Sequence, residues 1–190
     1  MAVGIEANAE HAIVVGPSEF DGTERTVMSP GKVVAEPGAR PTPVEILAYL
    51  VGGWSVERAS DSGYRFAGDL RLRRVSETCL VGVERGESIL GSRRLPALRE
   101  YAFRVGDSGE QIEVLASGVG AGSGLAGMGL LHRLVFREEG GLVRAAHEHV
   151  CGGDIYRIEM VIVGADRFET TYCVRGPNKG YWLRSGYRRD

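Results

Sequence analysis

The chain has 190 residues, with 23 lysines and arginines against 25 aspartates and glutamates, so its formal net charge is −2. This balance argues against a nucleic-acid-binding protein, which normally carries a basic excess on one face. Hydrophobic residues make up 43% and charged residues 25%, as in ordinary globular proteins. No apolar run reaches the roughly 18 residues that suggest a transmembrane helix. We therefore expect a soluble, cytoplasmic protein without a membrane partner, whose three cysteines are reduced.

The first 43 residues differ in composition from the rest of the chain. They contain five of the seven prolines, and Phe20 is their only aromatic residue. Each proline fixes φ and removes a backbone donor, which disfavours long helices and central strands. We predict a flexible arm over residues 1–41 and one folded domain over residues 42–190.

The folded domain is expected to begin with a short helix. Thr42 suits the N-cap and Pro43 the first helical position. Glu45, at the third helical position, completes a capping box with Thr42. Gly52 and Gly53 end the helical spacing after about two turns. A helix this short is marginal alone, so we expect it to dock on the rest of the domain.

After residue 53 the pattern changes to short runs in which apolar and polar residues alternate, separated by glycine-rich turns. We predict strands over residues 54–58, 64–74, 79–85, 98–105, 111–117, 130–137, 142–151, 154–163, 168–175 and 181–189. Consecutive strands with short turns predict an all-β fold, an antiparallel up-and-down barrel with the short helix closing one end. A barrel of about eight strands can hold one small ligand, and closure removes the exposed edges.

The segment Gly52-Gly53-Trp54, which follows the helix and opens the first strand, resembles the Gly-x-Trp start of calycins, the lipocalin and fatty-acid-binding superfamily. The resemblance implies that Trp54 packs under a basic residue of the last strand through a cation–π contact. The candidates for that residue are Arg184, Arg188 and Arg189.

The densest group of polar side chains lies in the last third of the chain. Alternation places His147, His149 and Cys151 on one face of a strand, and a glycine turn leads to Asp154 and Tyr156 on the next. His132 belongs to a similar face of the run 130–136, in which Leu130, Leu134 and Phe136 alternate with it. We interpret these residues as an interior polar site; the alternative is a hydrogen-bonded structural network in the core.

Lys179 stands out because Lys32 is the only other lysine in the chain. It lies in the turn Gly176-Pro177-Asn178-Lys179-Gly180 between two predicted strands. Lysine is a compact charge that arginine does not replace well, which suggests a specific task. The alternative is a solvated loop residue.

Two motifs extend the resemblance: His149-x-Cys151-x-x-Asp154-x-Tyr156 and Gly176-Pro177-x-Lys179-x-Tyr181. With the Gly-x-Trp start, they make residues 46–189 similar to a bacterial and fungal calycin-like family of unknown function. The sequence departs from that family in an insertion over residues 118–129, and in Gly180 where an acidic residue is usual. The resemblance implies a fold and does not imply a known reaction.

Two further motifs are typical of other kinds of site, a dinucleotide site and a metal site. Residues 122–127 match G-x-G-x-x-G, but a dinucleotide site needs a following helix and residues 130–137 are expected to form a strand. We interpret residues 118–129 as a flexible loop over the barrel mouth. His147-x-His149 partly resembles the first cupin motif, yet a metal would also need His132 or Cys151. We expect no metal and no cofactor.

Three functions remain open from the sequence. The first is a cofactor-independent isomerase, cyclase or lyase acting on a largely apolar, carbonyl-containing metabolite. His149 would be the base, oriented by Asp154, while Tyr156 donates a proton and Lys179 stabilises negative charge. The second is a non-catalytic binding or carrier barrel. The third is a structural or partner-binding role of the arm.

The remaining candidates would contact the substrate. His147 is the alternative base and Tyr181 the alternative acid. The expected partner is a small molecule, with a homodimer left open. The predicted substrate-binding residues are His132, His147, Cys151, Tyr172, Arg175 and Tyr181.

Overall fold

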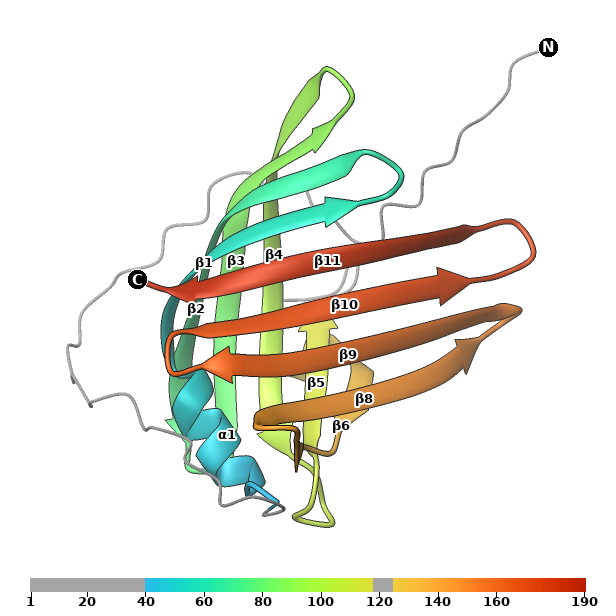
Figure 1. Ribbon diagram of the computed structural model, residues 1–190. Coiled ribbons are helices and arrows are strands. Elements are labelled where there is room, and N and C mark those ends of the chain that lie inside the picture. Colours follow the sequence, from blue (N-terminus) through green and yellow to red (C-terminus); the bar gives the residue numbers. More distant parts are fainter. Residues whose placement is uncertain (1–39, 118–124) are drawn as a thin grey trace.

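A computed structural model describes residues 40–117 and 125–190 of the chain (Figure 1). The predicted arm, apart from residues 40 and 41, and residues 118–124 of the predicted loop lie outside the described residues. The predictions made for those two segments therefore stay predictions.

The described residues form one antiparallel sheet of eleven strands, in the order β6-β5-β4-β3-β2-β1-β11-β10-β9-β8-β7. Nearly every strand pairs with its neighbours in sequence, and β1 pairs with β11, which joins the first and second halves of the barrel wall. The strands are β1 (Gly52–Ser60), β2 (Tyr64–Ser76), β3 (Cys79–Leu90), β4 (Arg93–Val105), β5 (Ile112–Ser117), β6 (Met128–Leu134), β7 (Arg137–Glu139), β8 (Leu142–Cys151), β9 (Asp154–Gly164), β10 (Arg167–Arg175) and β11 (Gly180–Arg189).

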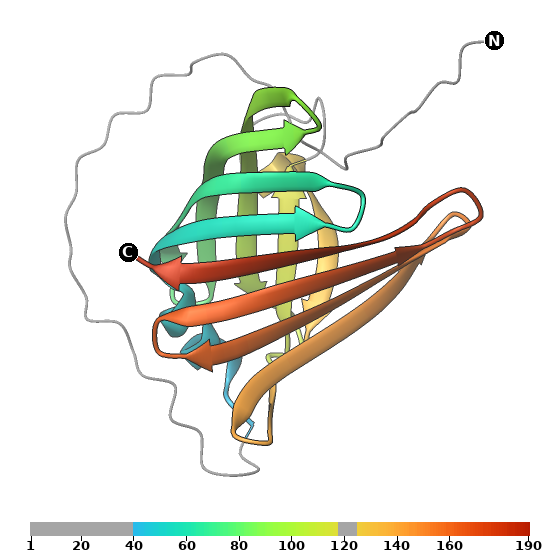
Figure 2. The same cartoon turned by 45° about the horizontal axis from the view of Figure 1, so that its top comes forward.

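The sheet curls on itself, so that β8–β11 cross in front of β4–β6 (Figures 1 and 2). β6 and β8 contact each other where the two ends of the sheet meet, although the described residues form no ladder between them. The predicted antiparallel, calycin-like barrel with a closing helix is therefore confirmed as a fold class. Its wall is a curled half-barrel that backbone hydrogen bonds do not close completely.

Helix α1 (Pro43–Leu50) begins as its sequence predicts. The Thr42 backbone N–H donates to the Glu45 carboxylate at 2.8 Å, and the Glu45 N–H donates to the Thr42 hydroxyl at 3.3 Å, which completes the capping box. The buried face of α1 lies against one end of the barrel (Figure 1) and contributes Ile46, Leu47, Tyr49 and Leu50 to the core. In the part of the chain that the structure describes, α1 is the one α-helix, and eight residues fall far short of a membrane span.

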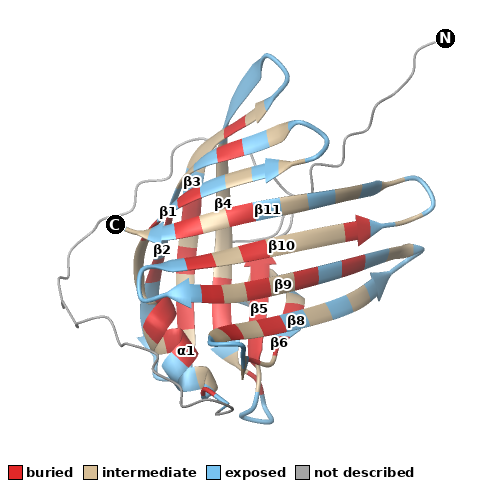
Figure 3. Ribbon diagram, in the orientation of Figure 1, coloured by how far each residue is buried: buried red, intermediate tan, exposed pale blue. Residues whose placement is uncertain are grey.

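The apolar core combines the buried face of α1 with inward residues of most strands, and Figure 3 shows buried positions on the helix and along both sides of the sheet. Trp54 is completely buried there, and its indole N–H donates to the backbone carbonyl of Leu50 at 2.8 Å. The guanidinium of Arg189 lies over its ring. The predicted contact between Trp54 and a basic residue of the last strand is therefore confirmed, with Arg189 as that residue.

Two facing glycines let β2 and β3 approach closely inside the barrel. Gly68 and Gly86 are cross-strand partners, and a Cβ added to either would lie within 2.7 Å of the other's Cα. The same added atom on Gly86 would lie 2.7 Å from the ring of Phe66. Only glycine fits at these two positions, and the space that they leave lets Phe66 pack into the core.

One part of the predicted alternation is wrong. The pairing of β5 with β6 shifts register between Val114 and Leu115, as in a β-bulge. His132 and Leu134, beyond the shift, are buried as predicted, whereas Leu130 is 42% exposed. An extra residue at a bulge reverses the faces of the residues that precede it, and sequence alternation alone does not reveal that reversal.

Candidate functional site

Three of the four histidines of the chain meet in the barrel interior. His132 comes from β6, and His147 and His149 come from β8, so the contact between these two strands brings them together. The His132 ring centroid lies 5.7 Å from that of His147 and 5.5 Å from that of His149. One ring nitrogen from each residue can be chosen so that all three lie within 4.8 Å of one another.

The environment of two of these imidazoles, those of His132 and His147, favours the neutral form. His132 is only 2% exposed, and burial, followed by the nearby His149 and His147, lowers its pKa to about 3. Burial and the neighbouring His149 also lower the pKa of His147. The Nδ1 atom of each of the three rings is buried and has no hydrogen-bond partner in the described part of the chain. Buried polar atoms are nearly always paired, so three unpaired ones in one place are unusual.

Lys179 lies beside this group, at the end of β8 and β9 that carries their connecting turn. Its ammonium donates to the Tyr156 hydroxyl at 2.6 Å and pairs with the Asp154 carboxylate at 2.8 Å. The Asp154 and Tyr156 hydrogen bonds raise the pKa of Lys179 well above its usual value. A Cβ on Gly176 would collide with the Asp154 carboxylate, so glycine is needed for this carboxylate to reach Lys179.

Tyr156 connects the lysine to the histidines. Its ring stacks on that of His149, with centroids 5.1 Å apart and planes 10° from parallel. The sequence-based hypothesis had Asp154 orienting His149, but the structure pairs Asp154 with Lys179 and leaves the His149 Nδ1 atom without a partner. The reason is the β10–β11 turn, which brings Lys179 against Asp154, a tertiary contact that strand alternation does not encode.

A second polar group, which the sequence analysis missed, lies deeper in the interior. Arg58 of β1 donates both terminal nitrogens to the Glu84 carboxylate of β3, at 2.9 and 2.7 Å. Its Nε–H donates to the Ser185 hydroxyl at 2.8 Å, and Tyr187 accepts a further hydrogen bond at 3.1 Å. The side chains of Arg58 and Glu84 are 9% and 4% exposed, so this is a buried ion pair. Both residues lie at inward positions of alternating strands, which was the signal available in the sequence.

Arg99, the cross-strand partner of Glu84, adds another cation. Its guanidinium lies 5.0 Å from the centroid of the Tyr101 ring, and its Nε atom is buried without a hydrogen-bond partner. Arg99 borders a cavity of about 200 Å³. The other residues that line this cavity are Ala116, Ser117, Gly127, Gly129, Leu130 and Leu131.

Tyr172 links the two polar groups. Its ring centroid lies 5.2 Å from that of His132, and burial raises its pKa strongly, with Tyr101 and Arg99 as close electrostatic neighbours. The interior therefore holds a band of polar side chains that runs from Arg58 through Arg99, Tyr172 and the histidines to Lys179. Such a band can bind and orient a ligand oxygen with several donors.

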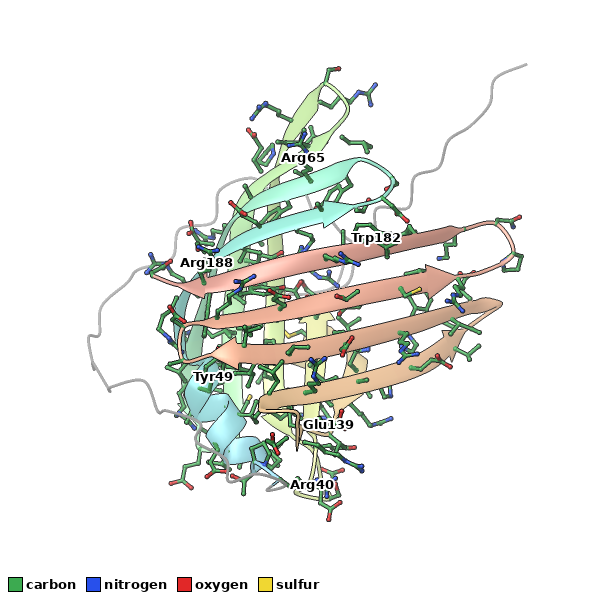
Figure 4. All side chains as sticks on the ribbon, in the orientation of Figure 1. Arg40, Tyr49, Arg65, Glu139, Trp182 and Arg188 are labelled. Carbon is green, nitrogen blue, oxygen red and sulfur yellow. The ribbon has the colours of Figure 1, made fainter. Side chains whose placement is uncertain are left out.

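The structure brings together most, and not all, of the residues that the sequence singled out. His132, His147, His149, Tyr156, Tyr172, Asp154 and Lys179 belong to the interior band. Tyr181 is half-buried on β11, opposite Val174. Cys151 and Arg175 are exposed. Figure 4 shows the side chains on their strands, with Tyr49 at the junction between α1 and the β9–β10 turn.

Comparisons with known proteins concern the family and the fold. The sequence model of DUF6314, a family of unknown function, matches residues 50–189. The chain is similar in structure to the S-type phycobiliprotein lyase CPES from Guillardia theta, with a TM-score of 0.53, 13% identity, and coverage of 80% of this chain and 94% of that one. It is also similar to the redesigned β-barrel mFAP0 bound to DFHBI, with a TM-score of 0.42, 13% identity, and coverage of 74% and 99%. No curated protein matches the chain.

Proposed function

The chain belongs to DUF6314, a family of unknown function, and we propose that its barrel binds a small, carbonyl-containing molecule and acts on it by acid–base chemistry. The observation that carries this proposal is the hydrogen bond from Lys179 to Tyr156, inside a polar band that lines an otherwise apolar barrel. The phycobiliprotein lyase shares this fold, and its name supports small-molecule chemistry as one use of such a barrel.

Binding is supported by the excess of donors in the interior. Both oxygens of Glu84 already accept hydrogen bonds from Arg58, and the Nε–H of Arg99 has no acceptor among the residues that the structure describes. A buried donor without a partner is costly, and a ligand oxygen in the adjoining cavity would satisfy it. The pocket that Arg99 borders offers about 200 Å³ for such a ligand.

Catalysis is supported by the pairing of Lys179 with Tyr156. An ammonium that donates to a phenol oxygen polarises the phenol. The phenol then interacts more strongly with a substrate atom through its own hydrogen bond. In its phenolate form, Tyr156 would accept the proton from the carbon beside a carbonyl, while Lys179 stabilises the negative charge that develops on the carbonyl oxygen. The Tyr156 phenol would then return the proton to another carbon in an isomerisation, or to a leaving group in an elimination. Asp154 pairs with Lys179 and not with His149, so this step uses Lys179 and Tyr156.

A carrier barrel without catalysis is the alternative, and the same unsatisfied donors support it. An activity screen separates the two. The full chain is incubated with a metabolite extract, and mass spectrometry follows which compounds disappear and which are formed. An enzyme of the proposed type depletes one compound and forms a product of equal mass, or one that has lost a small neutral molecule.

Variants test the roles of the two residues. Tyr156→Phe should reduce turnover about a hundredfold or more, the usual scale for a positioned acid–base group. Lys179→Arg keeps the charge and changes its shape, so we expect a partial loss. Arg157→Ala, an exposed residue next to Tyr156, is the matched control and should be unaffected. Retention of an unchanged compound in native mass spectra, with no turnover in any variant, would favour the carrier. If the protein showed no retained compound and no turnover, both hypotheses would be contradicted.

A further inference from the structure

We propose that His132, His147 and His149 form a binding site for one divalent first-row transition metal ion, with Zn²⁺ as the expected occupant. This inference goes beyond the proposed function and differs from the sequence-based expectation that the protein holds no metal. It does not depend on the identity of any substrate.

The geometry of the three rings supports the site. Their ligand nitrogens lie within 4.8 Å of one another, whereas three nitrogens on a tetrahedral zinc ion lie about 3.4 Å apart at Zn–N distances of about 2.0–2.1 Å. Small rotations of the side chains close this difference. His147 and His149 are two residues apart on one strand and point the same way, and His132 approaches from β6. Two elements of the barrel wall therefore supply the ligands.

The unpaired ring nitrogens provide an independent argument. Each of the three Nδ1 atoms is buried and makes no hydrogen bond to the described residues 40–117 and 125–190, so none of these residues competes for the Nδ1 atoms. A structural hydrogen-bonded network, the alternative considered from the sequence, would have paired them. Neutral imidazole is the form that binds a metal ion, and three such ligands leave a fourth position for water or a ligand oxygen.

The charge of Lys179, which is linked to the site through Tyr156, is balanced by Asp154. Arg99 is a second cation near His132, and its charge is not balanced by Glu84, whose carboxylate pairs with Arg58. The rings are also supported from outside, because His149 stacks on Tyr156 and His132 lies against Tyr172. These contacts restrict the ring orientations before a metal binds, as neighbouring groups do in metal sites.

The test measures metal binding by the full-length chain without any small molecule. The protein is treated with a chelator, and Co²⁺ and then Zn²⁺ are added while visible absorption and bound metal are recorded. We expect one equivalent of Co²⁺ with the strong visible bands of tetrahedral coordination, displaced by one equivalent of Zn²⁺, and a raised Tm. His147→Asn and His149→Asn should each weaken metal binding by about tenfold or more. Loss of a residue that only contacts a metal ligand can already cost about tenfold in affinity, so loss of a ligand should cost at least as much.

Controls make the result specific to this site. His11→Asn removes the fourth histidine of the chain and should bind like the wild type. Lys179→Arg should also bind metal normally, which separates this inference from the proposed function. The two variants of β8 are chosen because their side chains are only half-buried; circular dichroism checks that they fold. Less than stoichiometric binding, unchanged binding in both variants, or a sulfur-to-cobalt charge-transfer band that implicates Cys151 would overturn the three-histidine site.

Discussion

The guanidinium of Arg189, in the last strand, lies over the indole of Trp54, in the first strand, with its Cζ atom 4.1 Å from the ring centroid. The same guanidinium donates to the backbone carbonyls of Val51 at 2.8 Å and of Tyr49 at 2.5 Å. These carbonyls belong to the end of α1, where helical hydrogen bonds run out. One side chain therefore joins the helix to both β1 and β11, the strand pair that links the two halves of the sheet.

Arg189→Ala should lower the free energy of unfolding by about 2–4 kcal/mol, because it removes a desolvated cation–π contact and two charged hydrogen bonds. Urea denaturation measures this change. Arg188→Ala is the control: Arg188 is exposed (Figure 4), and its loss should change stability by no more than about 0.5 kcal/mol. Equal effects of the two substitutions would contradict the assigned role of Arg189.

The buried pair of Arg58 and Glu84 should behave differently from a surface pair. Glu84→Ala leaves a buried guanidinium without its partner and should cost about 3–5 kcal/mol of unfolding free energy. The double substitution Arg58→Met and Glu84→Leu should recover much of that loss, because it removes both charges. Arg94→Ala, which breaks the exposed pair with Glu87, should cost about 0–1 kcal/mol in the same assay. A double variant no more stable than Glu84→Ala would show that this pair is needed for packing.

Gly176→Ala should separate Asp154 from Lys179, because the new methyl group occupies the place of the carboxylate. The chain has two lysines, so the ¹⁵N-lysine side-chain NMR spectrum is simple enough to follow Lys179. We expect a protected Lys179 ammonium signal in the wild type and its loss in the variant. Gly180→Ala is the matched control, since a Cβ there meets nothing within 4 Å. A signal that persists in Gly176→Ala would mean that the carboxylate has another route to Lys179.

Two tyrosines should make stability fall in strong alkali. Burial is the largest influence on each and raises the pKa of Tyr49 and of Tyr101 to about 12, against about 10 in an unfolded chain. Since the folded pKa is the higher one, their contribution is fully present below pH 10 and is lost as the pH rises through 12. Phenolate absorption of native and urea-unfolded protein checks this. If every tyrosine of the native protein titrated at the same pH as the tyrosines of the unfolded protein, the predicted rise in pKa would be contradicted.

Deletion of residues 1–39 should leave the Tm of the remaining chain nearly unchanged. The proline-rich composition of this segment gives it little means to bury apolar surface on the barrel. Calorimetry of the full and shortened chains compares the two transitions. A loss of several degrees would show that the segment packs on the domain or on a partner.

The sequence by itself determined the local features of this protein. The Thr42 capping box lies within four residues, so its side chains and backbone meet whatever the rest of the chain does. Strand alternation repeats every two residues, and it correctly predicted His147, His149 and Tyr156 on the inward faces of β8 and β9. It was wrong for Cys151, which is exposed because β8 ends there in the turn to β9. The glycines and turn residues between strands gave the antiparallel order. These are short-range effects, and sequence records them directly.

The tertiary structure decided which inward residues meet. His132 reaches His149 only because the sheet curls until β6 contacts β8, and the register shift beside His132 sets which side of β6 faces in. The pairing of Arg58 with Glu84 spans β1 and β3, and that of Asp154 with Lys179 depends on the shape of the β10–β11 turn. Each of these contacts joins residues from different strands, and their distances follow from the curvature of the whole sheet. Alternation gives each side chain a face, but only the curled wall gives it a partner.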